Sequence, residues 1–111
     1  MVNNAVSERG VERVYAALGD PVRRAMVERL RRGPSSVSEL GAPLGMTLAG
    51  VGKHVAVLEA SGLIRTAKVG RARRCELVAG SLDEAAAWIA ETRAFWNAGM
   101  DRMIDHLTES A

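Results

Sequence analysis

The chain has 111 residues, of which 48% are hydrophobic and 25% charged, and its only cysteine is Cys75. This composition is that of an ordinary globular protein, and the length suits one domain over residues 1–111, small for an enzyme with a closed pocket. No apolar run is long enough to cross a membrane, residues 1–14 lack the apolar block of an export signal, and a single cysteine excludes an internal disulfide. We therefore expect a cytoplasmic protein with no membrane partner, in which Cys75 is a buried structural thiol.

Positive charge is concentrated in one segment, although the net charge is only +2. Between residues 53 and 74 a single acid, Glu59, accompanies six basic residues: Lys53, Arg65, Lys68, Arg71, Arg73 and Arg74. From residue 81 onward the balance reverses, and six acids outnumber two arginines. This asymmetry indicates a polyanionic partner for the first segment, and water or another subunit beside the second.

Helix signals cover the first third of the chain. Residues 11–18 place apolar side chains at helical spacing. Asp20 followed by Pro21 is a typical helix start, because the first can cap the helix and the second fits its first turn. The Gly-Pro pair at positions 33 and 34 ends this second helix. The apolar residues of the two helices are Val11, Val14, Tyr15, Leu18, Val22, Met26, Val27 and Leu30.

A short helix, a turn and a longer helix follow. Ser36 or Ser38 can cap the short helix, and Pro43 and Gly45 end it. Thr47 is then the expected N-cap of a helix over residues 47–61. The expected buried stripe of this helix consists of Leu48, Val51, Val55 and Leu58.

Gly50, Gly52 and Lys53 raise the alternative of a nucleotide-binding phosphate loop. That motif needs a preceding strand, two glycines five positions apart, and a serine or threonine after the lysine. Here His54 follows the lysine, the glycine spacing differs, and the preceding segment has the pattern of a helix and a turn. Lys53 lies opposite the apolar stripe of the helix, which favours contact with the phosphate of DNA instead.

The periodicity changes after this helix. Residues 63–69 are predicted as one strand, Gly70 as a turn, and residues 74–78 as a second strand with Cys75 and Leu77 on one face. A short helix, a turn, a longer helix and a basic-tipped hairpin, in this order, are typical of a winged helix-turn-helix. We therefore predict a mainly α fold of about five helices with a two-stranded β-hairpin wing, whose reading helix enters the major groove.

The last predicted helix carries a continuous apolar side. Ser81, with Glu84 three residues later, forms a capping box, and the helical pattern continues to about Leu107. Large apolar residues recur every seven positions, and Trp88 and Phe95 widen the stripe. Packing onto the domain's own core is one explanation. We expect instead a homodimer seam, which the N-terminal helix completes. The expected seam residues are Val11, Val14, Leu18, Leu82, Ile89, Trp96 and Met103.

The predicted domain therefore has two parts, a DNA-binding core with its wing over residues 11–80 and a dimerisation helix over residues 81–108. The chain also resembles the ArsR/SmtB family of bacterial winged-helix repressors over residues 11–107. The resemblance is carried by the segments LGDPVRRAMVERL, SVSELGAPLGMTLAGVGKHVAVLEASGLI, KVGRARRCELV and LDEAAAWIAETRAFWNAGMDRMIDHL. It implies a homodimer that binds a palindromic operator and releases it when an effector arrives.

The ligand sets of metal-sensing relatives are not matched in the sequence. The helix before the reading helix has no paired cysteines, and the last helix offers only His106 and Glu109 beside Asp105, half of a four-ligand zinc site. No metal or cofactor is therefore expected. The C-terminal segment resembles a metal-independent subgroup whose effectors are mostly unidentified, so the effector of this chain is unknown.

The predicted DNA contacts lie in the reading helix and the wing. Gly50 and Gly52 stand where relatives commonly have serine, so fewer side chains can reach bases. The expected contacts are Thr47, Ala49, Gly50, Lys53 and His54 of the helix, and Arg71 and Arg73 of the wing. An ordinary solvated lysine is the alternative for Lys53, and packing on a neighbouring helix is the alternative for His54.

These patterns predict a homodimeric, sequence-specific regulator of transcription, an (auto)repressor that binds a palindromic site in double-stranded DNA. No enzyme activity is expected, since two histidines so differently placed assemble no catalytic set. Three alternatives stay open. They are a winged-helix module that binds an acidic protein, a non-specific architectural DNA-binding protein, and a redox switch at Cys75.

Overall fold

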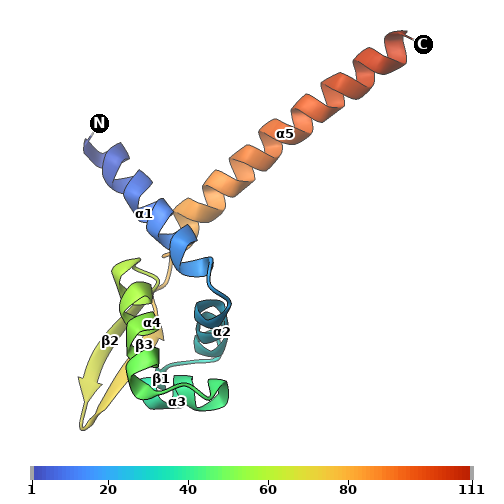
Figure 1. The fold of residues 1–111 in the computed structure, drawn as a ribbon. Helices are drawn as coiled ribbons and strands as arrows, with labels where there is room; N and C mark the ends of the chain where they lie inside the picture. Colours follow the sequence, from blue (N-terminus) through green and yellow to red (C-terminus); the bar gives the residue numbers. More distant parts are fainter. Residues whose placement is uncertain (1, 111) are drawn as a thin grey trace.

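A computed structural model describes the backbone of residues 2–110 and the side chains of residues 10–109. Its elements in chain order are α1 (Val2–Leu18), α2 (Pro21–Leu30), β1 (Ser35–Ser36), α3 (Val37–Gly41), the 3-10 turn η1 (Ala42–Leu44), α4 (Leu48–Ala60), β2 (Ile64–Val69), β3 (Ala72–Leu77) and α5 (Asp83–Ser110). The elements from α2 to β3 form a globular head, and α1 and α5 diverge from its upper end (Figure 1). The predicted mainly α fold with five helices is confirmed.

Three helices begin at side chains that the sequence predicts as caps. Asp20, Ser36 and Thr47 cap α2, α3 and α4, and each accepts hydrogen bonds of 2.8–3.2 Å from backbone N–H groups two or three residues later. Of the two serines considered for α3, Ser36 is therefore the cap. The hydrogen bond from the backbone N–H of Arg23 is the main cause that lowers the pKa of Asp20 below its usual value.

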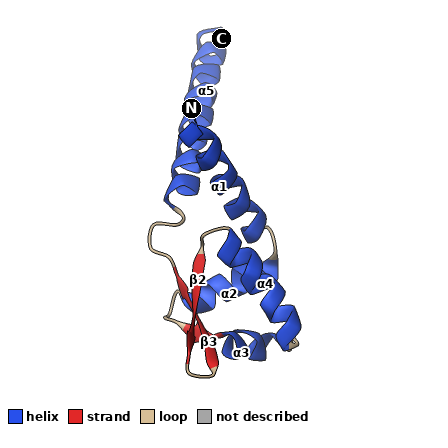
Figure 2. Cartoon of the chain, turned by 90° about the vertical axis from the view of Figure 1, so that its left-hand side faces the viewer, coloured by secondary structure: helices blue, strands red, loops and turns tan. Residues whose placement is uncertain are grey.

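The hairpin of β2 and β3 confirms the predicted two-stranded wing, and a third strand that was not predicted, β1, extends the sheet. Its order is β1-β3-β2, with both pairs antiparallel. Ser35 pairs with Cys75 and Ser36 pairs with Arg74. The edge of β3 that does not pair with β2 is therefore covered by β1. A strand of two residues has no alternating pattern of its own, and its pairing depends on a segment about 40 positions away. Figure 2 shows the sheet along one side of the head and the helices on the other.

The core lies between α1, α2, α4 and the sheet. Its largest fully buried side chains are Met26, Leu58, Leu63, Ile64, Val51 and Cys75. Cys75 is buried as predicted, and this burial raises the pKa of its thiol. Leu77 is partly buried against the same core, which confirms that the two residues share one face of β3.

Leu48 corrects one part of the predicted stripe on α4. Val51, Val55 and Leu58 are buried as expected, whereas Leu48 is 65% exposed. Leu48 is the first residue of α4, and the core contact of the helix begins one turn later at Val51. The apolar period of the helix therefore predicted correctly which side is buried. It did not predict how far along the helix the burial extends, because this depends on where the neighbouring elements end.

Tyr15 joins α1 to the base of α5. Its hydroxyl donates a 2.8 Å hydrogen bond to the carbonyl oxygen of Ala85, and its ring meets the ring of Trp88 edge to face with centroids 6.0 Å apart. Beyond this joint α5 projects away from the head (Figure 1). Within residues 2–110, no helix combines the length and the apolar character needed to cross a membrane.

Candidate nucleic-acid interface

The helix-turn-helix consists of α3, the turn η1 and α4. Gly45 takes a left-handed backbone conformation with φ of 64°, which reverses the chain before the cap of α4. The Cβ of any residue larger than glycine at position 41 would lie 2.2 Å from Cγ2 of Val51. Gly41 therefore allows α3 and α4 to pack at close range, which fixes the direction of the reading helix.

The predicted reading-helix residues lie on two different sides of α4. Ala49 and Lys53 are exposed on the side opposite the core, where a duplex could approach. Thr47 is also exposed, and although its hydroxyl oxygen accepts the capping hydrogen bond, its O–H can still donate. Gly50 is partly buried, and a Cβ at this position would lie 3.3 Å from atoms of Met46 and Thr47.

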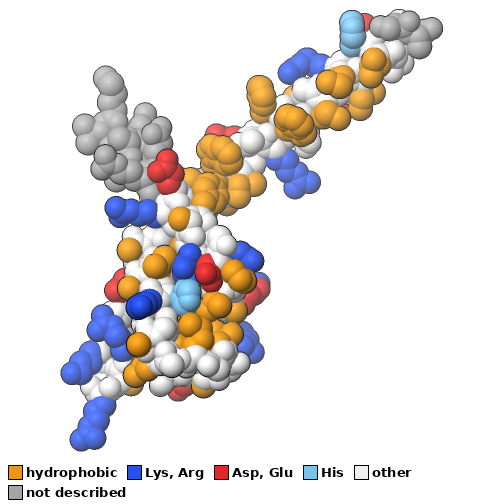
Figure 3. All heavy atoms as spheres, in the orientation of Figure 1, with side chains coloured by type: hydrophobic (Ala, Val, Ile, Leu, Met, Phe, Trp, Pro, Cys, Tyr) orange, Lys and Arg blue, Asp and Glu red, His pale blue; other side chains and the backbone are white. Residues whose placement is uncertain are grey.

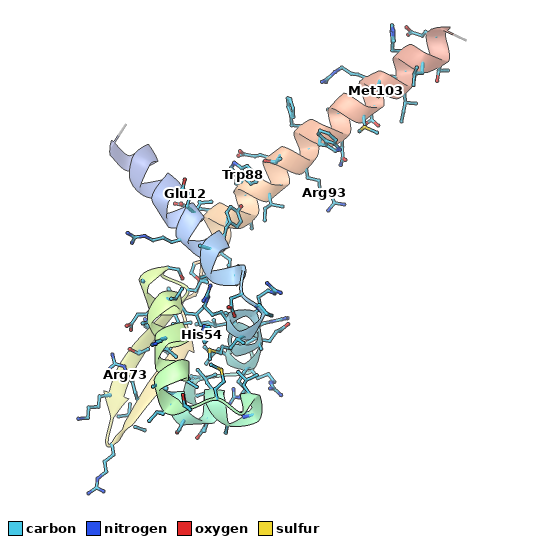
Figure 4. All side chains as sticks on the ribbon, viewed as in Figure 1. Glu12, His54, Arg73, Trp88, Arg93 and Met103 are labelled. Atoms are coloured by element: carbon cyan, nitrogen blue, oxygen red, sulfur yellow. The ribbon has the colours of Figure 1, made fainter. Side chains whose placement is uncertain are left out.

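His54 lies on the side of α4 that faces α2, as Figure 4 shows. It is partly buried, and its Nδ1 is 3.3 Å from Nη1 of Arg23. The structure therefore contains the packing contact that the sequence left as the alternative for this residue. A DNA contact through the other ring nitrogen is compatible with that packing.

Arg71 and Arg73 lie at the tip of the wing, where β2 and β3 are joined at Gly70. Both side chains are exposed, and Arg73 pairs in register with Lys68 across the hairpin. Lys and Arg side chains gather at this tip in the space-filling view (Figure 3). The predicted basic wing is therefore present as a surface.

An open groove of about 530 Å³ separates α4 from the wing. Its walls come from Ser36, Val37, Ser38, Leu48, Gly52, Val55, Ala56, Glu59, Arg71, Ala72 and Arg73. The α4 wall is low because Gly52 and Ala56 have almost no side chain, whereas the opposite wall carries two guanidinium groups. Such a groove can admit a phosphate backbone beside the reading helix.

Glu59 ties the wing to α4 although it stands among basic residues. Its Oε2 accepts hydrogen bonds from the backbone N–H of Thr66 at 3.1 Å and from the hydroxyl of Thr66 at 2.6 Å. These bonds join the last turn of α4 to the edge strand β2. The carboxylate thus fixes the angle between helix and wing.

Known proteins with similar sequence and structure agree with this geometry. A family model described as a helix-turn-helix domain matches residues 18–67. The HTH-type transcriptional regulator Rv2034 of Mycobacterium tuberculosis is 34% identical over 100 residues, which are 87% of this chain and 91% of that protein. A crystal structure of an ArsR family transcriptional regulator, RHA00566, is 42% identical, with a TM-score of 0.73 over 84% of this chain and 93% of that chain. The chain belongs to the ArsR family.

The resemblance predicted from the sequence is therefore confirmed, and this ArsR-family chain is a transcriptional regulator with a DNA-binding winged helix-turn-helix. A homodimeric winged helix-turn-helix domain, Mb0332 from Mycobacterium bovis, has the same fold. That domain is 19% identical, with a TM-score of 0.64 over 89% of each chain.

The residues predicted for the dimer seam of this ArsR-family chain fall into two groups. Val14 is buried in the core of its own subunit, and Val11 and Leu18 are partly buried. The other four residues, at and within α5, are exposed, by 43% at Leu82, 51% at Ile89, 68% at Trp96 and 57% at Met103. Only the α5 group therefore offers a large apolar surface.

Two residues of the interface were missed by sequence reasoning. Arg23 was not singled out in the sequence, and Glu59 appeared there only as an isolated acid in a basic segment. Their positions three residues after the cap Asp20 and in the last turn of α4 are visible in the sequence, but their partners lie on other elements. Among the described residues, no three His, Cys, Asp or Glu side chains gather as a metal site would require.

Proposed function

We propose that the chain is a homodimeric repressor that binds a palindromic site in double-stranded DNA in the cytoplasm. In this proposal α4 enters the major groove, with contacts from Thr47, Ala49, Gly50, Lys53 and His54, and Arg71 and Arg73 hold the phosphate backbone. The observation that carries it is that Lys53 on α4 and the arginines at the wing tip are all exposed, while an open groove lies between α4 and the wing.

The exposed apolar side chains of α5 support the proposal of a dimer. Beyond the seam residues, large exposed side chains include Trp88, Phe95, Met100, Ile104 and Leu107. Monomeric proteins rarely expose so continuous an apolar surface. A second α5 is the partner of matching chemistry, and hydrophobic side chains follow this helix in Figure 3.

Residues with short side chains on α5 favour close packing of two such helices. Along one side of the helix, Thr92 and Gly99 alternate with large apolar residues at spacings of three and four positions. The large residues are Ile89, Trp96 and Met103. A Cβ at Gly99 would have only the flexible end of Arg102 within 4 Å, at 3.8 Å. The glycine therefore leaves room for a side chain of another subunit.

The dimer gives the mechanism of repression. Two reading helices bind half-sites about 34 Å apart, one turn of the duplex, and so block a promoter. An effector that changes the angle between subunits would alter this spacing and release the DNA.

The test is the affinity of the purified protein for a duplex that it has itself selected from a random library, compared with a scrambled duplex. A dimer with about six phosphate contacts should lose roughly 10³-fold in affinity between about 50 and 200 mM salt. The selected duplex should bind at least about 10³-fold more tightly than the scrambled one. Equal affinity for both would indicate an architectural protein, and no affinity for either would favour the protein-binding module.

A further inference from the structure

Arg23 connects three helices through one guanidinium group. It belongs to α2, and its Nε and Nη2 donate hydrogen bonds to the carbonyl oxygens of Ala17 and Ala16, at 2.7 and 3.0 Å. These carbonyls lie in the last turn of α1, where acceptors lack a partner within the helix, and the carbonyl of Ala16 also accepts a hydrogen bond from the backbone N–H of Gly19. The remaining nitrogen, Nη1, lies 3.3 Å from Nδ1 of His54 on α4. The end of α1 is thus joined to the reading helix.

This contact determines which ring nitrogen of His54 carries the proton. A guanidinium group has five N–H donors and no acceptor, so Nδ1 must be the acceptor. In a neutral imidazole the proton is then on Nε2. The orientation and the tautomer of the ring both follow from Arg23.

The Nε2 atom of His54 lies at the surface. It has no hydrogen-bond partner among the described residues, and none of their buried side-chain nitrogens or oxygens lacks a partner. An Nε2 without a partner is therefore accessible to solvent. It lies on the edge of α4, next in sequence to the exposed Lys53, on the flank that Figure 4 shows beside α2.

The charged groups around this ring are arranged to hold it. The Nη1 atom of Arg23 also lies 3.9 Å from the Oδ2 atom of Asp20, the cap of α2. The guanidinium is therefore fixed on one side by a carboxylate and on the other by two carbonyls. If the imidazole of His54 only filled space in the packing, it would not need a guanidinium donor held in place at its Nδ1.

We propose that Arg23 is a positioning residue for DNA binding, which turns the Nε2–H of His54 outward as a donor to a DNA phosphate. This inference rests on the proposed function, because it assumes that α4 lies in the groove. It adds a hydrogen bond from the Nε2–H of His54 to a phosphate oxygen. A histidine that only packs between helices would not make this bond. It also couples the end of α1 to the reading surface.

The first test is nitrogen-15 NMR of the free protein at alkaline pH, with the His54 signals identified by their loss in His54→Gln. We expect a protonated Nε2 and an unprotonated Nδ1. In Arg23→Met the ring should relax toward a mixture of both tautomers, whereas Arg23→Lys, which keeps a donor, should preserve the single form. A wild-type ring protonated at Nδ1 would overturn the inference, and this measurement requires no DNA.

The second test is a double-mutant cycle on affinity for the selected duplex. His54→Ala should weaken binding about tenfold, whereas His54→Gln, whose amide can donate from nearly the position of Nε2, should retain most of it. Arg23→Met should weaken binding to a similar extent, and the double variant should be no weaker than His54→Ala alone.

The outcomes separate this inference from the proposed function. If Lys53→Ala weakens binding and His54→Ala does not, the histidine contact is absent although the DNA-binding proposal stands. Additive losses in the double variant would mean that Arg23 acts independently of His54. If Arg23→Met does not fold, the inference is still tested by the tautomer of His54 in the wild-type protein and by the affinities of His54→Ala and His54→Gln. A wild-type protein with no affinity for DNA would contradict the proposed function itself.

Discussion

At the scale of single residues, Gly41 controls how closely the two helices of the helix-turn-helix approach. Because a Cβ at this position would lie 2.2 Å from Val51, Gly41→Ala should lower the free energy of unfolding by about 1–3 kcal/mol. Chemical denaturation measures this change. The matched control is Gly52→Ala on α4, where the added methyl group meets no atom within 4 Å and should stabilise the helix by about 0.5–1 kcal/mol. Equal stability of Gly41→Ala and wild type would contradict the close packing.

Cys75 gives a second residue-scale prediction, which concerns pH. Burial raises the pKa of its thiol above the usual value of 9.0, so the unfolded chain loses this proton at lower pH than the folded one. Stability from this group is therefore complete below about pH 9 and is lost as pH rises toward the folded pKa. Thermal unfolding should show a fall in Tm above pH 9 that is smaller in Cys75→Ala. Rapid alkylation of the native thiol would instead support the redox alternative.

At the scale of elements, the wing and α4 act as one unit because Glu59 holds Thr66. Arg71→Ala combined with Arg73→Ala should weaken binding to selected and scrambled duplexes alike, and should reduce the slope of log affinity against log salt by about one for each lost phosphate contact. The control is the double lysine variant at the same positions, which retains the charge and should retain the slope. Loss of sequence preference in the alanine variant would indicate that the wing reads bases.

At the scale of the whole molecule, most of the exposed large hydrophobic side chains among the described residues lie on α5. Trp96→Ala should raise the dissociation constant of the dimer by about thirtyfold or more, since truncation of an aromatic hot spot costs about 2 kcal/mol or more. Sedimentation equilibrium measures it, and the head should keep its helical signal because Trp96 is 68% exposed within the subunit. Glu91→Ala, on another side of α5, serves as control. An unchanged dimer would place the seam elsewhere.

The sequence predicted what depends on local interactions. The starts of α2, α3 and α4 were found because each cap hydrogen bonds to a backbone group only two or three residues away. The buried side of α4 followed from its apolar period, apart from Leu48, whose exposure depends on where neighbouring elements end.

Features that depend on distant partners were not predictable in the same way. Strand β1 exists because β3 offers it an edge, and its two residues carry no period. The roles of Arg23 and Glu59 depend on side chains 31 and seven positions away, in elements whose relative placement the sequence does not state. The predicted contacts on α4 and the seam on α5 stay predictions until DNA binding and association are measured.

Because α5 is held to the head only near its base, at Tyr15, a small rotation there moves its far end a long way. A rod of 28 residues is about 42 Å long, so a turn of about 10° at its base sweeps its far end through about 7 Å. That arc equals the rise of about two base pairs. In a dimer assembled through such helices, a small change of angle at the contact between Tyr15 and Trp88 would therefore change the distance between the two reading helices by a comparable amount.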